Sequence, residues 1–451
     1  MTIIGNARTI AGFIENVAQQ PLPVDVENAA RMCLADWVAV ALGAYDQTAG
    51  QLARDVASSW QSAGPSPVLL AGTASPIASA LVNGTFAHCL DFDDTHVGSL
   101  SHLSGPTWAA VLALAAERPM TEAGILRAFV SGFEVGARIG GNLFGETVNQ
   151  RGFHATSVFG KFAATAAACT ALGLRGDAIA HALGIAATQG NGLVASFGTM
   201  GKPLHAGKAA MDGVLSAQLA ARGFTANPEL LEPGARGFSD VLLQDQSVGI
   251  ASLSFDGGWE VLNNTFKPYA ACLMTHPAIE AAQQIGTQVH PAQVLKIEAR
   301  VNPMAIRFAS KTELHEPLDG KFSLSFCIAL GLAGRDLTQG DFNDASIRDT
   351  DYLRLMSCVE LIPDQSIKAT SASLRVVCED GGIISMDIPL ASGTPGRPMT
   401  WHQMQKKFAS LTQPVLGDAT HSIFNAIKTF GAGDCFPALI ATIADAGNDN
   451  T

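Results

Sequence analysis

The chain has 451 residues, of which 47% are hydrophobic and 15% charged, and its formal net charge at pH 7 is -12. This length exceeds what one compact core usually supports, so it predicts two domains. The acidic charge, together with the lack of a basic stripe with interleaved aromatic residues, argues against nucleic acid as a partner.

The sequence carries no signal of a membrane or secreted protein. No run reaches the roughly 18 apolar residues of a membrane span, and the N-terminus lacks the features of a signal peptide, so we expect a cytoplasmic protein with no membrane partner. The eight cysteines form no C-x-x-C pair, which disfavours a zinc ribbon and gives no iron-sulfur spacing. A mean hydropathy of +0.22 leaves little polar surface and favours an obligate oligomer.

The first part of the chain has a helical pattern. From the start to about Leu262, apolar residues recur with helical spacing, and Gly, Pro or Asn separates the segments. The Ala-rich stretches 161–174 and 179–187 are typical of helices buried on most sides. Gly132, Gly136 and Gly140 recur every fourth residue, a spacing that lets helices approach closely. We therefore predict an all-α domain whose first part is 1–262.

The pattern changes after Pro268. Leu295, Ile297, Ala299 and Val301 alternate with charged residues, which predicts a half-buried strand. Two further apolar runs, 374–378 and 383–388, flank a Glu-Asp-Gly-Gly turn and predict a β-hairpin.

Helical signals at 322–332 and 352–358 interleave with these strands, so 263–395 is predicted to be a smaller α+β domain. Helical spacing returns at 401–411 and 420–430. We expect segment 396–451 to return to the helical domain, which would make that domain discontinuous.

The loop that follows the helical signal at 80–87 concentrates groups suited to acid/base chemistry. It reads Asp91-Phe92-Asp93-Asp94-Thr95-His96, with His102 shortly after. Carboxylates beside imidazoles supply groups of different basicity within reach of one substrate. Alternatively, Asp93 or Asp94 caps a helix, although one cap would not explain the whole cluster.

Three further polar segments stand in apolar surroundings. The first places His154 at the start of a helix, and the second, 198–207, carries Lys202 and His205 but does not match a P-loop. The third joins the two predicted domains and contains Lys267, Cys272 and His276. Small-ligand clefts often form at such junctions. The alternatives are a capping turn for His154, solvated surface charges for the lysines and an inert buried thiol for Cys272.

These segments carry a family resemblance. The motifs are Asp91-Phe92-Asp93-Asp94-Thr95-His96, His154-Ala155-Thr156-Ser157-Val158-Phe159-Gly160, Lys202-Pro203-Leu204-His205-Ala206-Gly207 and Phe266-Lys267-Pro268-Tyr269. In this order they resemble the MmgE/PrpD family, which includes 2-methylcitrate dehydratase, cis-aconitate decarboxylase and iminodisuccinate epimerase. The resemblance implies a homodimer whose helical domain is built from both chain ends, with an α+β lid and the active site between them.

The resemblance also implies action on small di- or tricarboxylates without a metal or organic cofactor. The positions that match the family's site are Asp91, Thr95, His102, His154, Lys202 and Lys267. Lys202 and Lys267 are expected to bind substrate carboxylates. Neutral His154 or Asp91 is the candidate base, while protonated His102 or a lysine ammonium is the candidate acid.

Two departures from the family bear on the reaction. Cys272 stands where decarboxylase-like members carry a histidine, and Phe326 stands where they carry a tyrosine and cannot donate a hydrogen bond. Cys272, His276 and Arg307 join Thr95 as candidate substrate contacts, although His276 has an equally good role at a helix start. We therefore expect a dehydratase of a 2-methylcitrate-like hydroxy acid. The alternatives are an epimerase of an imino- or amino-dicarboxylate, a cis-aconitate-type decarboxylase, and a non-catalytic carboxylate-binding homodimer.

Overall fold

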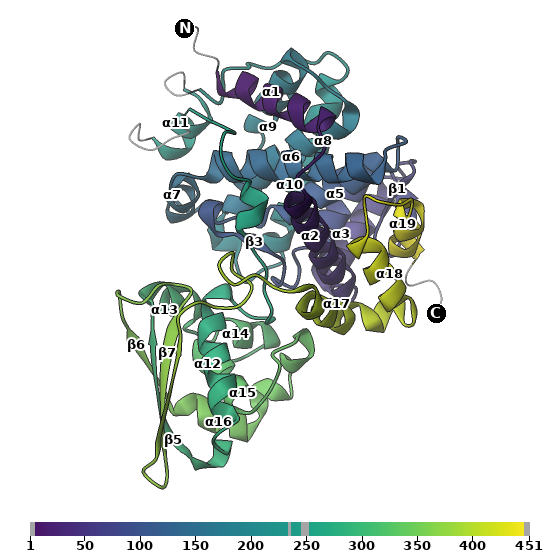
Figure 1. Ribbon diagram of the computed structural model, residues 1–451. Helices are drawn as coiled ribbons and strands as arrows, with labels where there is room; N and C mark the ends of the chain where they lie inside the picture. The colour runs from purple at the N-terminus through teal and green to yellow at the C-terminus, as the bar shows by residue number, and fades with distance from the viewer. Residues whose placement is uncertain (1–4, 233–235, 245–251, 446–451) are drawn as a thin grey trace. The chain divides into compact units, whose positions relative to one another are not determined.

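The computed structural model describes residues 5–232, 236–244 and 252–445. The chain divides into two compact units (Figure 1). Unit 1 comprises Met1–Thr265 and Met404–Thr451, and unit 2 comprises Phe266–Gln403. None of the helices within the described residues is long and apolar enough to cross a membrane.

Unit 1 is built almost entirely of helices. They are α1 (Asn6–Gln19), α2 (Val24–Gly43), α3 (Thr48–Ser59), α4 (Pro76–Phe86), α5 (Ser104–Ala115), α6 (Glu122–Gly140), α7 (Phe144–Gln150), α8 (Ala155–Leu172), α9 (Asp177–Ala187), α10 (Gly201–Ala220), α11 (Phe238–Leu243), most of α17 (Trp401–Leu416), α18 (Ala419–Lys428) and α19 (Phe436–Asp445). Two short antiparallel pairs join them: β1 (Ser66–Pro67) with β2 (Thr73–Ala74), and β3 (Thr95–His96) with β4 (Asn264–Thr265).

The core of unit 1 surrounds helix α8. Every residue of α8 from Ala155 to Cys169 is buried, as expected for an Ala-rich helix with neighbours on all sides. It packs against α5, α6 and α10. A Cβ atom at Gly132 would lie 2.5 Å from the Ala163 carbonyl oxygen, and one at Gly136 would lie 2.7 Å from the Ala163 Cβ. The glycine spacing in α6 thus serves close helix packing, as predicted.

Gly207 allows a second close approach, and its replacement tests that packing. A Cβ atom there would lie 2.2 Å from the Thr85 Oγ1 and 2.3 Å from the Leu81 carbonyl oxygen of α4. Because the helix backbone cannot yield easily, we expect Gly207→Ala to lower the free energy of unfolding by about 1–3 kcal/mol in urea titrations. Gly12→Ala is the matched control, since its Cβ would meet nothing within 4 Å. Equal stability of the two variants would contradict tight α4–α10 packing.

Unit 2 combines a mixed sheet with helices. The strands are β5 (Val294–Val301), β6 (Val359–Pro363), β7 (Ala372–Cys378) and β8 (Ile383–Ile388), in the order β6-β5-β7-β8. Strand β6 runs parallel to β5, and the other neighbours are antiparallel, including the predicted β7–β8 hairpin. The helices are α12 (His276–Gly286), α13 (Pro303–Ala309), α14 (Pro317–Lys321), α15 (Leu324–Leu332) and α16 (Thr350–Ser357). Figure 1 shows α12 beside the sheet, where it packs against β7 and β8.

One detail of the strand prediction is wrong. Leu295 was expected on the buried face of β5, but 55% of its surface is exposed, and Val294 is buried instead. The register with β7 shifts between Val294 and Lys296, so the alternation restarts at that irregularity. From Ile297 onward the predicted alternation is confirmed. Together, the helical unit and the α+β unit confirm the predicted fold class.

Candidate active site

The loop between α4 and α5 carries most of the site. Asp91 has a φ of 51°, in the left-handed region, so the chain turns sharply at the end of the helical segment. Downstream, Thr95 pairs with Thr265 through β3 and β4. Backbone hydrogen bonds between His96 and Ser101 in both directions then close the bend that places His102 beside the carboxylates.

Asp93 lies between two histidines. Its Oδ2 is 2.8 Å from Nδ1 of His88 and 3.2 Å from Nδ1 of His102. Burial alone would raise the pKa of Asp93, but the neighbouring His102 and His88 rings outweigh it and hold that pKa well below 3.8. An ionised carboxylate accepts from both Nδ1–H groups, which leaves Nε2 of each ring as the basic atom. Among the described residues, Nε2 of buried His88 has no hydrogen-bond partner.

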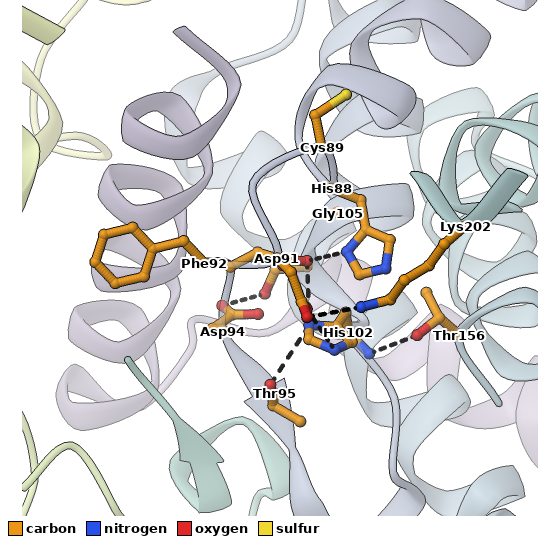
Figure 2. A network of polar contacts seen from close by, with 12 residues as sticks. His88, Cys89, Asp91, Phe92, Asp94, Thr95, His102, Gly105, Thr156 and Lys202 are labelled. Atoms are coloured by element: carbon orange, nitrogen blue, oxygen red, sulfur yellow. Dashed lines mark hydrogen bonds and ion pairs between the residues drawn. The ribbon is translucent and has the colours of Figure 1, made fainter. Parts of the chain in front are cut away.

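Asp91 brings a cation to the same cluster. Its Oδ2 is 2.8 Å from Nζ of Lys202, near the start of α10, and its Oδ1 is 3.8 Å from Nε2 of His102 (Figure 2). The His102 backbone N–H donates to Oγ1 of Thr156 at 3.0 Å, and the Thr95 hydroxyl lies 3.4 Å from Nδ1 of His102. The ring of His102 is therefore held from several sides.

His154 lies at the edge of this cluster. It precedes the first residue of α8, only 3% of it is exposed, and its ring stacks on His88 with centroids 5.7 Å apart. Burial, followed by the charges of His88 and Lys202, holds its pKa well below 6.5, so the ring is neutral near pH 7. Its Nδ1 lies 3.1 Å from Nδ1 of His205.

Unit 1 thus brings together five of the residues predicted from the sequence: Asp91, Thr95, His102, His154 and Lys202. The others belong to unit 2. Lys267 is 3% exposed there, and Arg307 is an exposed residue of α13. The Cys272 backbone N–H donates to the Lys321 carbonyl oxygen at 2.9 Å.

His276 begins α12 and is fully buried in unit 2. Its Nε2 lies 3.2 Å from the Ala271 carbonyl oxygen, and Tyr269 packs against its ring edge to face. Phe326 is also fully buried, with its ring against those of Phe342 and Tyr352. Both rings therefore have structural contacts within unit 2.

The sequence names Thr156 and His205 only as members of motifs, without a role at the site, and gives no sign of His88 or of the pair formed by Asp36 and Lys407. His88 follows an apolar helix end and looks like a core residue. The helix-cap alternative for Asp93 and Asp94 is wrong, because α5 has no side-chain cap and begins only at Ser104. Asp94 instead accepts a hydrogen bond from the Ser104 hydroxyl at 2.6 Å.

A buried ion pair connects the loop between α4 and α5 to α2 and α17. Nζ of Lys407, in α17, lies 2.6 Å from Oδ1 of Asp36 in α2 and 2.7 Å from the Phe92 carbonyl oxygen. The other oxygen of Asp36 accepts the Asp94 backbone N–H at 2.9 Å. Both charged side chains are at most 2% exposed. The loop backbone is thus held on the side away from the histidines.

Asp94 predicts a pH dependence of stability. Burial, followed by repulsion from Asp36, raises its pKa from 3.8 to about 8. A raised folded-state pKa favours the protonated folded form, so its contribution is complete below about pH 4 and is lost as the pH rises to about 8. We expect the free energy of unfolding to fall by up to about 1.4 kcal/mol per pH unit over this range, and Asp94→Asn to remove most of that fall. Urea titrations at several pH values measure both slopes, and equal slopes would contradict the shift.

Four side chains of the cluster are close enough to share a metal ion. His88, Asp91, Asp93 and His102 each offer a ligand atom, and these atoms lie within 4.8 Å of one another. However, Asp93 already accepts from both histidines, and the Lys202 ammonium lies against Asp91. A divalent cation would have to displace those contacts, so we assign no metal to the cluster.

Comparison with known proteins identifies related enzymes. Residues 8–251 match the MmgE/PrpD N-terminal domain, and residues 269–429 match the MmgE/PrpD C-terminal domain. A cis-aconitate decarboxylase from Aspergillus terreus (strain NIH 2624 / FGSC A1156) is 30% identical over 297 residues, which cover 62% of this chain and 60% of the relative. The chain thus spans 60% of the length of that relative.

Two further relatives share less identity but more of the chain. A cis-aconitate decarboxylase from Homo sapiens is 26% identical over 368 residues, covering 78% of this chain and 76% of the relative. A 2-methylcitrate dehydratase from Cupriavidus necator is 26% identical over 342 residues, covering 68% of this chain and 69% of the relative. With both domain matches in order along the sequence, the chain belongs to the MmgE/PrpD family.

Proposed function

We propose that the protein is a lyase of small di- or tricarboxylates that works by acid/base chemistry with its own side chains. The observation that carries this proposal is the cluster in which Asp93 lies between His88 and His102 while Lys202 contacts Asp91. The loop and the start of α10 thus present carboxylates, imidazoles and an ammonium within hydrogen-bond reach of one another. Relatives named as decarboxylase and dehydratase support the same reaction class.

The chemistry follows from the groups present. Removing a proton from the carbon next to a carboxylate needs an unprotonated base, and buried His154 is unprotonated because its pKa is lowered well below 6.5; Asp91 is the alternative base. Charge then grows on the substrate carboxylate, which an ammonium such as that of Lys202 stabilises. Loss of a hydroxyl needs an acid, and His102 acts as that acid when both its ring nitrogens are protonated: Asp93 holds the Nδ1 proton and Nε2 donates the other. Positioned groups of this kind each contribute about 100- to 10,000-fold in rate.

Dehydration of a 2-methylcitrate-like hydroxy acid is the reaction we propose first, because the cluster combines a base, an acid and a cation. Decarboxylation of a cis-aconitate-like acid is the second candidate, and the names and coverage of the Aspergillus and human relatives favour it. Phe326 supplies no hydroxyl to such a reaction. Epimerisation would use the same proton abstraction without loss of a group.

Proton NMR in deuterated water separates these reactions. The purified protein is incubated with 2-methylcitrate, citrate, cis-aconitate and aspartate-derived dicarboxylates. A new alkene signal with loss of the hydroxyl supports dehydration, itaconate-type signals with release of carbon dioxide support decarboxylation, and α-proton exchange alone supports epimerisation. Lys202→Met should abolish the reaction, while Lys296→Met, which removes an exposed lysine of β5, should not. An unchanged spectrum with every substrate would contradict the proposed lyase.

We also propose that the protein acts as a homodimer. The support is the apolar composition, with a mean hydropathy of +0.22, and the family membership. Size-exclusion chromatography with light scattering measures the mass directly, and a mass near the 46.9 kDa of one chain would contradict this assembly.

A further inference from the structure

We propose that His205 is a proton relay that connects His154 to solvent. The inference rests on the proposed function only in that His154 exchanges a proton with substrate. Nδ1 of His154 and Nδ1 of His205 lie 3.1 Å apart, which is hydrogen-bond distance. Two such nitrogens form a hydrogen bond only when one carries a proton and the other does not.

The two rings differ in exposure, which sets the direction in which a proton would leave the site. His154 is 3% exposed, whereas His205 is partly exposed on unit 1. His154 is enclosed by His88, whose ring stacks on it at 5.7 Å, and by Phe197, whose ring meets it edge to face at 4.9 Å. A buried base that takes a proton must return it before the next turnover. Within the described part of the chain, the only hydrogen bond made by its ring leads to His205.

Gly192 positions the rings of His154 and His205 next to each other. Its carbonyl oxygen accepts the His154 backbone N–H at 2.9 Å, and its own N–H donates to the Ser157 hydroxyl at 2.8 Å. A Cβ atom at Gly192 would lie 2.4 Å from Cγ of His205, so only glycine leaves room for that ring. Gly192 therefore binds the backbone of His154 and at the same time leaves space for the ring of His205, which fixes the position of one ring relative to the other.

The proton transfers balance in three steps. A proton from substrate binds to Nε2 of neutral His154, and the proton on Nδ1 of His154 passes to Nδ1 of His205. His205 then releases the proton on its own Nε2 to water. One proton enters and one leaves, both rings end neutral, and the hydrogen bond between them is reversed. The same steps in the opposite order restore the starting tautomers: Nε2 of His154 gives its proton to the departing hydroxyl, Nδ1 of His205 returns a proton to Nδ1 of His154, and water reprotonates Nε2 of His205.

His205→Asn separates a relay from a structural contact. The asparagine side chain places an oxygen near the position of Nδ1, so it still accepts the hydrogen bond from His154, but it cannot pass the proton on. In protein labelled with ¹⁵N-histidine, we expect NMR to show that the Nδ1 proton of His154 exchanges with water at least about 10-fold more slowly than in the wild type. His181→Asn is the matched control, because its Nδ1 bonds only the Ala226 backbone. It should leave that exchange unchanged.

Turnover gives a second readout of the relay. At low buffer concentration His205→Asn should lower kcat by about 100-fold with little change in KM, and in His205→Ala added imidazole should restore most of the loss. Wild-type exchange and wild-type kcat in His205→Asn would overturn the relay. If the wild-type protein turns over no carboxylate, the exchange measurement still decides the relay, and only the proposed function fails.

Discussion

Replacing Asp93 with asparagine is expected to lower kcat by about 100- to 10,000-fold while the protein stays folded. In the wild type, one ionised oxygen of Asp93 accepts from Nδ1 of both His88 and His102. A neutral amide no longer stabilises a positive charge on either ring, and its N–H₂ group favours the opposite tautomer in one of them. In that histidine, Nε2 would then carry the proton and could no longer accept one from the substrate.

The measurement is the rate of product formation at saturating substrate, together with a thermal melt. Asp94→Asn is the matched control, because it makes the same change one residue away. The Asp94 side chain accepts from Ser104 and its backbone N–H bonds Asp36, so it should keep most of kcat. Equal losses in the two variants would show that an asparagine at either position harms the loop, which would remove the specific role assigned to Asp93.

Periodicity was enough to predict the fold class, because local patterns report local structure. The Ala-rich stretch that became α8 and the hairpin β7–β8 follow directly from apolar spacing and turn residues. The prediction of a buried Leu295 is wrong because a register irregularity depends on the partner strand, and the sequence of one segment does not reveal its partner.

The candidate site could be predicted only in part, and the prediction rested on clustered polar residues and family motifs instead of periodicity. Asp91, His102 and Lys202 came from their clustering and from the family motifs, and unit 1 brings them together. Asp93 and Asp94 are adjacent aspartates in the same loop, yet one contacts two histidines and the other contacts Ser104. Side-chain direction in an irregular loop depends on tertiary contacts, so no spacing rule separates their roles.

Long-range pairing was beyond prediction altogether. Asp36 and Lys407 are 371 positions apart, and each stands in a helical segment where a lone charge is usually solvated. Only the packed structure shows that both are buried and that they contact the backbone of the loop between α4 and α5. The large separation in sequence therefore concealed a contact to the loop that carries most of the candidate site.

Replacing Lys407 with methionine is expected to lower the free energy of unfolding by about 3–5 kcal/mol, the usual cost of leaving one buried charge without its partner. The variant would leave Asp36 buried among apolar neighbours, and it would remove the contact to the Phe92 carbonyl oxygen. Because the folded protein would then favour protonated Asp36, the loss should be smaller at low pH and grow as the pH rises.

Urea unfolding at several pH values measures this effect, with Lys406→Met as the matched control on the exposed face of the same helix. The double variant Asp36→Leu/Lys407→Met removes both charges and should recover only part of the stability. The remaining cost is the lost acceptor for the Asp94 N–H and the lost donor to the Phe92 carbonyl oxygen. If the ion pair also positions the loop, the double variant should stay below the wild-type kcat even where its stability has recovered. Suppose instead that the double variant regains both wild-type stability and wild-type kcat. The attraction between the two charges then only compensates for the cost of burying them, and the pair does not position the loop between α4 and α5.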